Sequence, residues 1–401
     1  MPKPAPHVSP RPGPLAGLRV VEFVGIGPAP FCTMLLSDLG AEVISIDRTV
    51  ASGLGIARPP RFDILARGRP VLRLDLKRPE GLALARELVG RADALVEGFR
   101  PGAMERLGLG PEDLLGQHPA LVYGRVTGWG QEGPLAQSAG HDLNYIALTG
   151  ALHAIGRAGQ PPTPPLNLVG DFGGGGLLLA FGIVCALHSA RATGRGQVVD
   201  AAMIDGAATL MASMFGLAAA GLHGTERGTN LLDSGAPHYD VYACADGQYV
   251  AVAPIEQKFR AQMLARLGIA PEDERLFADP ASWPQARALL AERFRAQPRA
   301  HWESLFADTD ACVAPVLTMA EAPAHAHHRA RGSFVEVDGV AHPAPAPRFS
   351  GTPAAAPGAD VRTAAERLAG WGLDEARLDA LAAAGVVHRD AGEIDKNRQG
   401  G

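Results

Sequence analysis

Three acid–base side chains stand in sequence contexts that could serve chemistry. His141 lies in the segment Gly-His-Asp-Leu-Asn-Tyr at 140–145, Asp171 precedes the glycine run 173–176, and Glu256 follows an apolar run. A histidine and a carboxyl group can each take up and return a proton near neutral pH. The glycines would let backbone N–H groups approach a negatively charged oxygen at the start of a helix. These residues therefore indicate proton transfer beside an anion-stabilising backbone.

Each of these side chains also has a purely structural interpretation. An aspartate at the start of a helix commonly caps it, which would account for Asp171. His141 and the adjacent Asp142 could form a hydrogen-bonded pair in a loop, and Glu256 could be an acid in the first turn of a helix. The sequence by itself leaves the catalytic and structural interpretations open.

Other familiar catalytic patterns are incomplete. The turn at 25–30 begins with Gly-x-Gly, but Pro30 replaces the third glycine of the dinucleotide-binding motif, which favours a plain strand-to-helix turn over a nicotinamide site. The chain contains no Gly-x-Ser-x-Gly elbow, and Asp-Phe-Gly at 171–173 lacks the other kinase motifs. The histidines within 325–328 have no neighbouring ligand set, so we expect no metal site.

Composition narrows the class of protein. The 401 residues predict about two domains, and an apolar content of 47% is enough for substantial cores. The 37 basic and 42 acidic side chains give a formal net charge of −5 without a polybasic block, so nucleic acid is not an expected partner. Four widely spaced cysteines, with no Cys-x-x-Cys, indicate a reducing compartment rather than a disulfide framework.

Targeting and membrane patterns point the same way. The first 14 residues are proline-rich and have no apolar core of a signal peptide, and the chain does not end in Ser-Lys-Leu. Residues 206–222 are the most membrane-like stretch, but small and polar residues dilute it, so we expect a buried interface helix and no membrane association. The sequence thus predicts a cytoplasmic location.

The elements that would position the candidate residues follow an alternating pattern. Short β-branched runs alternate with helical spacing, which predicts a parallel α/β sheet whose ligands lie at the carboxyl ends of the strands. The expected strands are 18–24, 42–46, 71–74, 94–96 and 121–127, and the expected helices are 31–39, 80–89, one near Met104, 177–190 and one from Val199. Further on we expect a hairpin at 239–252 around Asp246-Gly247, helices at 258–267, 282–297 and 299–306, a linker at 343–358, and helices at 362–371 and 375–384.

Several long motifs resemble the family III CoA-transferases, the CaiB/BaiF superfamily. They lie at 14–22, 38–43, 74–77, 97–102, 105–110, 128–134 and 196–203. Within that superfamily, Gly-His-Asp-Leu-Asn-Tyr at 140–145 and Asn-Leu-Val-Gly-Asp-Phe-Gly-Gly-Gly at 167–175 resemble the α-methylacyl-CoA racemase branch. The resemblance runs from about residue 14 to residue 349.

The resemblance implies an interlocked homodimer of two-domain chains. It places a large Rossmann-like CoA-binding domain at 14–200, linker helices at 201–238, a smaller α+β domain at 239–318, and a return linker with C-terminal helices at 319–387. Residues 1–13 and 388–401 are extensions without a counterpart. In such a dimer the small domain that serves an active site can come from the partner subunit.

The resemblance also assigns roles to individual residues. His141 and Asp171 correspond to the catalytic pair, and Glu256 to a supporting acid from the small domain. Arginine suits the phosphates of CoA because its planar guanidinium binds phosphate oxygens in pairs. The implied CoA contacts are Arg48, Leu74, Asp75, Leu76, Lys77, Gly98, Phe99, Arg100, Arg106, Gly140, Asp142, Leu143, Asn144 and Tyr145.

The implied reaction is epimerisation at C2 of a 2-methylacyl-CoA thioester. One base removes the C2 proton, an enolate forms, and a second group returns a proton to the opposite face, so His141 and Asp171 would alternate in the two roles. No cofactor or metal is needed, since CoA is part of the substrate. Two alternatives remain open: a CoA-transferase with Asp171 as the nucleophile, and a CoA-binding protein without activity.

The chain departs from the family in one region. The stretch at 50–65 is longer than expected, and Arg67-Gly-Arg69-Pro replaces the usual Arg-Asn-basic pattern. Contacts between CoA phosphates and this region are therefore not assigned.

Overall fold

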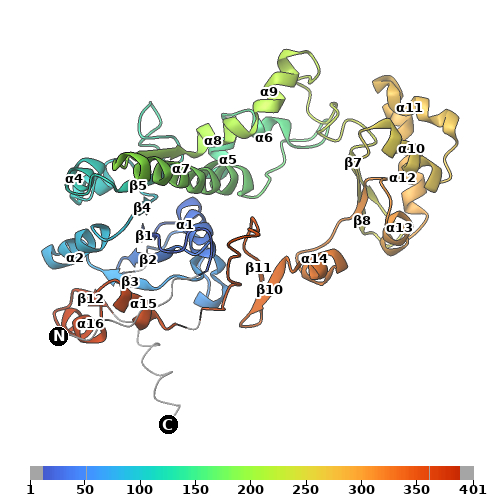
Figure 1. Cartoon of the computed structure of the whole chain (residues 1–401). Helices are drawn as coiled ribbons and strands as arrows, with labels where there is room; N and C mark the ends of the chain where they lie inside the picture. The colour runs from blue at the N-terminus through green and yellow to red at the C-terminus, as the bar shows by residue number, and fades with distance from the viewer. Residues whose placement is uncertain (1–11, 51, 361, 389–401) are drawn as a thin grey trace, which may run out of the picture. The chain divides into compact units, whose positions relative to one another are not determined.

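A seven-stranded sheet is the largest sheet of the computed structural model, which describes residues 12–50, 52–360 and 362–388 (Figure 1). The strand order β12-β3-β2-β1-β4-β5-β6 is parallel except for β12, which pairs antiparallel with β3. Order 3-2-1-4-5-6 is that of the dinucleotide-binding fold, with a switch point between β1 and β4. The strands are β1 (Arg19–Phe23), β2 (Glu42–Asp47), β3 (Val71–Leu74), β4 (Ala94–Glu97), β5 (Val122–Thr127), β6 (Val198–Ala202) and β12 (Val387–His388).

Helices cover both faces of this sheet because its central strands are apolar on both sides. All residues of β4 and β5 are buried, as expected for central parallel strands. On one face Val20, Val43 and Val96 pack with α1 (Pro28–Asp38) and α7 (Leu178–Thr193). The opposite face packs with α2 (Pro79–Val89) and the C-terminal helices α15 (Ala364–Gly370) and α16 (Glu375–Ala383). Shorter helices between the strands are α3 (Ala103–Arg106), α4 (Pro111–Gln117) and the 3₁₀ turns η1 (Pro60–Phe62) and η2 (Ile64–Ala66).

The expected elements of the sheet are confirmed, with one exception. We predicted a helix from Val199, but residues 198–202 form β6, and the helix α8 (Met203–Leu210) begins only afterwards. The segment pairs in parallel with β5, from Tyr123 opposite Val198 to Thr127 opposite Ala202. Pairing with a strand distant in sequence, which local periodicity cannot reveal, therefore decides its conformation.

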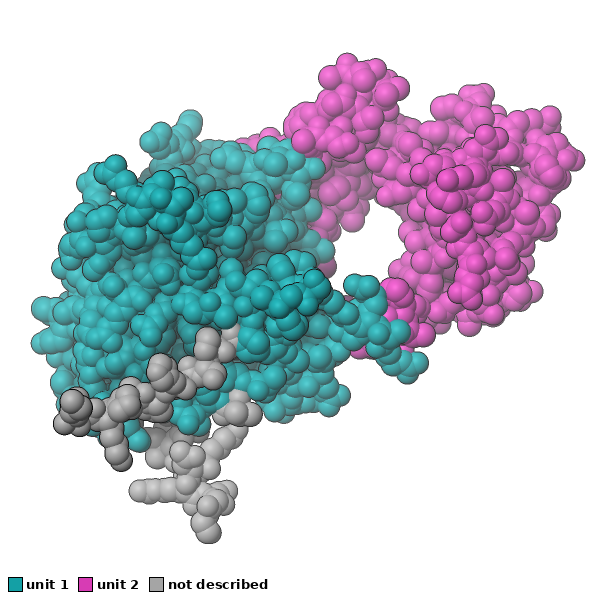
Figure 2. Space-filling view, in the orientation of Figure 1, with its two compact units in different colours: residues 1–145, 167–210, 329–401 teal, residues 146–166, 211–328 magenta. Residues whose placement is uncertain are grey.

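The chain divides into two compact units (Figure 2). The first contains residues 1–145, 167–210 and 329–401, and the second contains residues 146–166 and 211–328. Segment 146–166, which we expected within the large domain, thus belongs with the second unit. The N-terminal lead-in and the polar tail lie almost entirely outside the described residues.

The second unit is built on a three-stranded antiparallel sheet, β7-β8-β9. The predicted hairpin is confirmed, and Gly247 has the positive φ of 74° that its turn requires. Helices α10 (Gln257–Arg266), α12 (Trp283–Arg295) and α13 (Arg299–Phe306) bury their apolar sides on the sheet, in agreement with the sequence. The strands are β7 (Asp240–Ala243), β8 (Tyr249–Val252) and β9 (Val313–Pro315); the shorter helices are α6 (Ala151–Ala154), α9 (Ala212–Ala219), α11 (Arg275–Ala278), η4 (Pro271–Glu274), η5 (Pro280–Ser282) and η6 (Ala322–Ala324).

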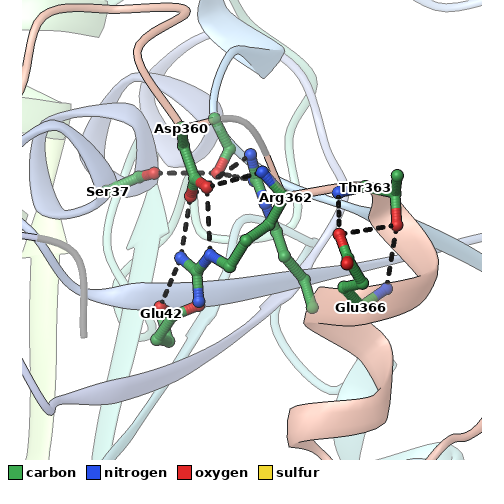
Figure 3. Close-up of polar contacts among 8 residues, drawn as sticks. Ser37, Glu42, Asp360, Arg362, Thr363 and Glu366 are labelled. Atoms are coloured by element: carbon green, nitrogen blue, oxygen red, sulfur yellow. Dashed lines mark hydrogen bonds and ion pairs between the residues drawn. The ribbon is translucent and has the colours of Figure 1, made fainter. Parts of the chain in front are cut away.

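The C-terminal part of the first unit is fastened to the sheet by polar contacts. Arg362 binds Glu42 at the start of β2 and also Asp360, with N···O distances of 2.8 and 2.7 Å (Figure 3). Thr363 and Glu366 form a capping box at the start of α15. These contacts hold the residues after the expected linker beside the amino ends of the strands. Earlier in the chain, residues 326–343 form α14 (Ala326–Arg331) and a hairpin of β10 (Phe334–Val337) and β11 (Val340–Pro343).

Two apolar segments of the chain, 206–222 and 168–193, are helical. Residues 206–222 form parts of two helices, α8 and α9, rather than the single helix that we expected, and no residue of α9 is buried within the chain. Among the described residues, the helical run Leu168–Thr193 is long and apolar enough to cross a membrane. Its second half, α7, buries Leu179, Ile183 and Leu187 against the sheet, as a core helix of a globular domain does.

Candidate active site

Asp171 lies at the switch point of the large sheet. The turn after β1 reaches Gly98 after β4: a Cβ built on Gly25 would lie 3.9 Å from the carbonyl oxygen of Gly98. In the same turn, a Cβ on Gly27 would lie 3.1 Å from Oδ2 of Asp171. Ligands of this fold bind at the carboxyl ends of the strands where the strand order reverses. Asp171 therefore occupies the position where a ligand of this sheet is expected.

The glycines after Asp171 allow close packing of its helix. Asp171 is the fourth residue of a π-helix, η3 (Leu168–Leu177), which continues directly into α7. A Cβ on Gly174 would lie 2.7 Å from the backbone nitrogen of Ala207, and one on Gly176 would lie 2.6 Å from the carbonyl oxygen of Pro28. No larger residue fits there, so the glycine run brings η3 against α8 and α1. π-Helical turns are frequent at functional sites.

The structure contradicts the capping interpretation of Asp171. The residue that accepts hydrogen bonds from N–H groups near the start of η3 is Asp142, whose Oδ2 lies 2.6 Å from the nitrogen of Gly170 and 2.7 Å from that of Asp171. The N-cap position belongs to Asn167, whose side chain makes no capping bond. The side chain of Asp171 is therefore available for another role.

His141 is exposed and lies directly before the helix α5 (Asp142–Ala147). Its carbonyl oxygen accepts a hydrogen bond from the nitrogen of Asn144, and its own N–H donates to Oδ1 of Asn144, at 2.8 and 3.1 Å. These contacts start α5. The alternative of a hydrogen-bonded His141–Asp142 pair is not formed: Oδ2 of Asp142 accepts hydrogen bonds from the backbone nitrogens of Gly170 and Asp171. The imidazole of His141 has no hydrogen-bond partner among the described residues.

The carboxyl group of Asp171 has a raised pKa. Burial is the largest cause, and the charge of Asp142 raises the pKa further, whereas a hydrogen bond from Asn167 and the charge of His141 lower it. The amide Nδ2 of Asn167 lies 3.1 Å from Oδ2 of Asp171. A carboxyl group with a raised pKa is better suited to exchange protons near neutral pH. The structure thus brings His141 and Asp171 within electrostatic reach of each other.

The side chain of Tyr145 packs against the residues that precede His141. Its ring packs edge-on against Trp129, with ring centroids 4.8 Å apart, and its hydroxyl donates to the carbonyl oxygen of Gly140. A Cβ on Gly128 or Gly140 would overlap the tyrosine ring. Burial, followed by the charge of Asp171, raises the pKa of Tyr145 to about 12, so it stays protonated and neutral. The implied contact of Tyr145 with CoA would have to use a largely buried side chain.

Glu256 belongs to the second unit, whereas His141 and Asp171 belong to the first. It occupies the N-cap position before α10, where its carbonyl oxygen accepts the backbone N–H groups of Phe259 and Arg260. Its side chain is exposed and makes no capping bond, so the alternative of a first-turn helix acid is also inexact. The carboxylate raises the pKa of the nearby Cys312 thiol, as a smaller contribution after burial.

Four basic side chains stand at the carboxyl ends of β2, β3 and β4. Arg48, Lys77, Arg100 and Arg106 are exposed, and none of them forms an ion pair within the part of the chain that the structure describes. Exposed cations without partners are suited to bind the phosphates of CoA.

The other implied CoA contacts divide by side-chain accessibility. The side chains of Leu74 and Asp142 are buried, which leaves only their backbones for a ligand. Leu143 and Asn144 are exposed on α5, although Asn144 already binds the nitrogen of His141. The rest, which line the loops after β3 and β4 or precede α5, are at least partly accessible: Asp75, Leu76, Gly98, Phe99 and Gly140.

Two arginines of the unusual segment are structural. Arg67 binds Asp38 with an N···O distance of 2.5 Å, and Arg69 binds Glu22 at 3.0 Å; all four side chains are buried. Ser45 joins the second pair through a hydrogen bond from its hydroxyl to Glu22. Because both guanidinium groups are committed to these carboxylates, they hold the segment after the 3₁₀ turns against the sheet.

The histidines within 325–328 lie in α14 and directly before it. His325 contacts Glu303 at 3.2 Å, and His327 and His328 lie on α14. Across residues 12–50, 52–360 and 362–388, no group of three or more His, Cys, Asp or Glu side chains is arranged to hold a metal ion.

Sequence reasoning missed two residues of this site. Asn167 lies four residues before Asp171, a spacing that brings side chains together on a helix, but the glycine-rich context concealed the helix. Asp142 was assigned to CoA, because nothing in the sequence indicates that its carboxylate reaches a segment 28 residues away.

Comparison with known proteins gives consistent similarities. The family model described as CoA-transferase family III matches residues 15–365. α-Methylacyl-CoA racemase of Mus musculus is 46% identical over 342 residues, which cover 85% of this chain and 87% of the mouse protein. The human α-methylacyl-CoA racemase is 44% identical, with coverage of 85% and 87%. Among solved structures, a CaiB/BaiF family protein from Brucella suis superimposes with a TM-score of 0.75 at 26% identity, covering 90% of this chain and 98% of that one.

Proposed function

Because the chain belongs to CoA-transferase family III, we propose that it is an isomerase that epimerises C2 of 2-methylacyl-CoA thioesters. Similarity to two α-methylacyl-CoA racemases at 44–46% identity over 85% of the chain supports this reaction. The observation that carries the proposal is the electrostatic interaction of His141 with Asp171, whose carboxyl group lies at the switch point and has a raised pKa.

The two residues would act on opposite faces of one carbon atom. One group takes the C2 proton as the C–H electron pair moves into the C1–C2 bond and the thioester oxygen becomes an enolate oxygen. The other group then donates its proton to C2 from the opposite face, and the carbonyl re-forms. His141 and Asp171 exchange roles when the other enantiomer is the substrate. Neither a cofactor nor a metal is required for this sequence.

The protonation states of the pair suit this exchange. For one enantiomer the starting enzyme needs a neutral histidine and a protonated aspartate; for the other it needs an imidazolium and an aspartate anion. These two states contain the same number of protons. The raised pKa of Asp171 brings them closer in energy, because it reduces the cost of the protonated carboxyl group.

The exposed cations at the strand ends would hold the CoA part of the substrate. Arg48, Lys77, Arg100 and Arg106 would pair with the phosphates, and the thioester would then extend toward the switch point. Glu256 would support His141 if the second unit of either chain brought it to the site.

CoA transfer is the second candidate function because Asp171 also has the chemistry of a nucleophile. Its carboxylate would attack the thioester carbonyl and release CoA thiolate, which gives a mixed anhydride on the enzyme. That pathway gives His141 no role, whereas epimerisation uses both residues. The electrostatic interaction of His141 with Asp171 therefore supports epimerisation over transfer.

We also propose that the protein is a homodimer. Along α7 the side chain of Phe181 is 65% exposed, and Leu177 and Val184 extend the same apolar stripe on the helix side that the sheet does not cover. A stripe of large exposed apolar residues is typical of a surface that another chain covers. A second copy of this chain is the occupant that the family resemblance suggests.

Epimerisation can be tested by incubating the wild-type protein in D2O with one enantiomer of a 2-methylacyl-CoA, with and without a free carboxylate acceptor. Deuterium at C2 together with conversion to the other enantiomer, both independent of the acceptor, is the expected result. CoA transfer to the acceptor with retention of the C2 proton would overturn epimerisation and favour the transferase.

A further inference from the structure

A buried carboxylate connects the two catalytic segments. Asp142 follows His141 directly in the chain, and only 4% of its surface is exposed. Its Oδ2 accepts hydrogen bonds from the backbone nitrogens of Gly170 and Asp171, at 2.6 and 2.7 Å. One side chain thus ties the residue next to one base to the backbone of the other base.

The contact imposes a requirement on its partner. A Cβ at position 170 would lie 2.8 Å from Oδ2 of Asp142, closer than such atoms pack, so only glycine allows the carboxylate to approach. Gly170 and Asp142 therefore form a matched pair. This accounts for a glycine just before Asp171, outside the run at 173–176.

A buried carboxylate is an energetically unfavourable acceptor for these two N–H groups. Its second oxygen, Oδ1, is buried and has no hydrogen-bond partner among the described residues. Burial of a charge with unused acceptor capacity costs free energy, and a hydroxyl group could accept a hydrogen bond with less desolvation. Proteins retain such locally unfavourable groups mainly at functional sites.

We propose that Asp142 is a positioning residue that sets the carboxyl group of Asp171 relative to His141 and biases its protonation. This inference rests on the proposed function and deepens it. The groups that act electrostatically on Asp171 are His141 and Asp142, and Tyr145 and the amide of Asn167 lie beside it. Asp142 is the negative charge among them. It therefore favours the protonated form of Asp171, while His141 and Asn167 favour the anion.

Two variants separate position from charge. Asp142→Asn keeps an acceptor oxygen of similar placement and removes the charge, whereas Asp142→Ala removes both. For Asp142→Ala we expect kcat to fall about 100-fold while KM changes little, because a misplacement near 1 Å costs about that factor. Asp142→Asn should retain most of the wild-type kcat. Its low-pH limb of kcat/KM should move to lower pH for the enantiomer from which Asp171 takes the proton.

A matched control is available at another helix start of the same unit. Asp374 accepts a backbone N–H from Arg377 at 2.9 Å before α16, and it is not one of the candidate site residues. Asp374→Ala should therefore leave kcat and the pH profile unchanged. Unchanged kcat in Asp142→Ala, or an unmoved low-pH limb in Asp142→Asn, would overturn the proposal. If Asp142→Ala does not fold, the Asn variant decides alone.

Amide hydrogen exchange gives a readout that does not depend on activity. In Asp142→Asn and, if folded, Asp142→Ala, exchange at the N–H groups of Gly170 and Asp171 should accelerate, most strongly in the alanine variant. If the wild-type protein neither exchanges C2 nor epimerises, the proposed function fails, and this measurement still tests the positioning contact. Unchanged exchange at both amides in every folded variant would contradict that contact.

Discussion

Gly27 and Asp171 meet across 144 residues of sequence: a Cβ on Gly27 would lie 3.1 Å from Oδ2 of the aspartate. Gly27 has φ of 66° and ψ of −110°, a conformation that residues with side chains rarely adopt. The glycine therefore allows both the turn after β1 and the close approach of Asp171. Through this contact the switch point of the sheet limits where the carboxyl group can lie.

Substitution of Gly27 should reduce activity beyond its effect on stability. In Gly27→Ala the new methyl group must displace Asp171 by a few tenths of an ångström, and we expect kcat to fall about tenfold. Gly53→Ala is the matched control, because Gly53 has the same φ of 66° and no atom within 4 Å of an added Cβ. Both variants should lose about 1–2 kcal/mol of unfolding free energy from backbone strain. Equal kcat values in the two variants would contradict the contact.

Neutralisation of Asp171 should stabilise the protein while it abolishes activity. Burial, with a contribution from Asp142, raises the pKa of Asp171 in the folded state, so the ionised form opposes folding at pH 7. Asp171→Asn removes this cost, and its unfolding temperature at pH 7 should exceed that of the wild type. The difference should shrink as pH falls through the folded-state pKa, because Asp171 in the folded wild type is then protonated and, like asparagine, uncharged.

Asp360 provides a control of the opposite sign. Although burial opposes it, hydrogen bonds from Arg362 lower the pKa of Asp360 to about 2. Its anion therefore stabilises the fold above the ordinary aspartate pKa, and Asp360→Asn should lower the unfolding temperature at pH 7. A lower unfolding temperature for Asp171→Asn as well would show that Asp171 is not under electrostatic strain.

The buried ion pairs of the segment before β3 should dominate its stability. Arg69→Ala would leave Glu22, 1% exposed, as an unpaired buried charge, which typically costs about 3–5 kcal/mol. Arg58→Ala breaks an exposed pair with Asp63 and should cost about 0–1 kcal/mol. Urea unfolding of the two variants measures this difference. Losses of equal size would refute a structural role for Arg69.

The apolar stripe on α7 should mediate dimerisation. Phe181→Glu places a charge on a residue that is 65% exposed in the chain, so its own fold should tolerate the change while a covering chain would not. Light scattering should report a dimer for the wild type and a monomer for the variant. A wild-type protein that is a monomer in this measurement would contradict the dimer.

Local patterns were sufficient to predict most of the large sheet. The strand at 71–74 and the helix at 299–306 have the predicted bounds, because each combines a clear periodicity with proline or glycine at its ends. β6 was mistaken for a helix because its conformation depends on pairing with β5. Residues 206–222 were expected to form one interface helix, but they are divided between α8 and α9, because composition shows that a segment is apolar and does not show where a helix is interrupted.

The candidate site shows the same limit at the level of single residues. His141 and Asp171 could be selected from their residue types and glycine-rich context, since acid–base chemistry restricts both. The roles of Asp142 and Asn167 depend on hydrogen bonds to Asp171 and its backbone, which appear only when α5 and η3 are folded against each other. A one-residue shift in either helix would leave the same sequence without these contacts.

The most direct test of the two-base account follows C2 exchange in the single-base variants, with each enantiomer of a 2-methylacyl-CoA in D2O. His141→Ala and Asp171→Ala should both lose epimerisation. Each variant should still exchange the C2 proton of one enantiomer only, and the two variants should act on opposite enantiomers, because each retains the base on one face. Exchange of the same enantiomer by both variants, or epimerisation by either one, would contradict proton transfer by His141 and Asp171 from opposite faces.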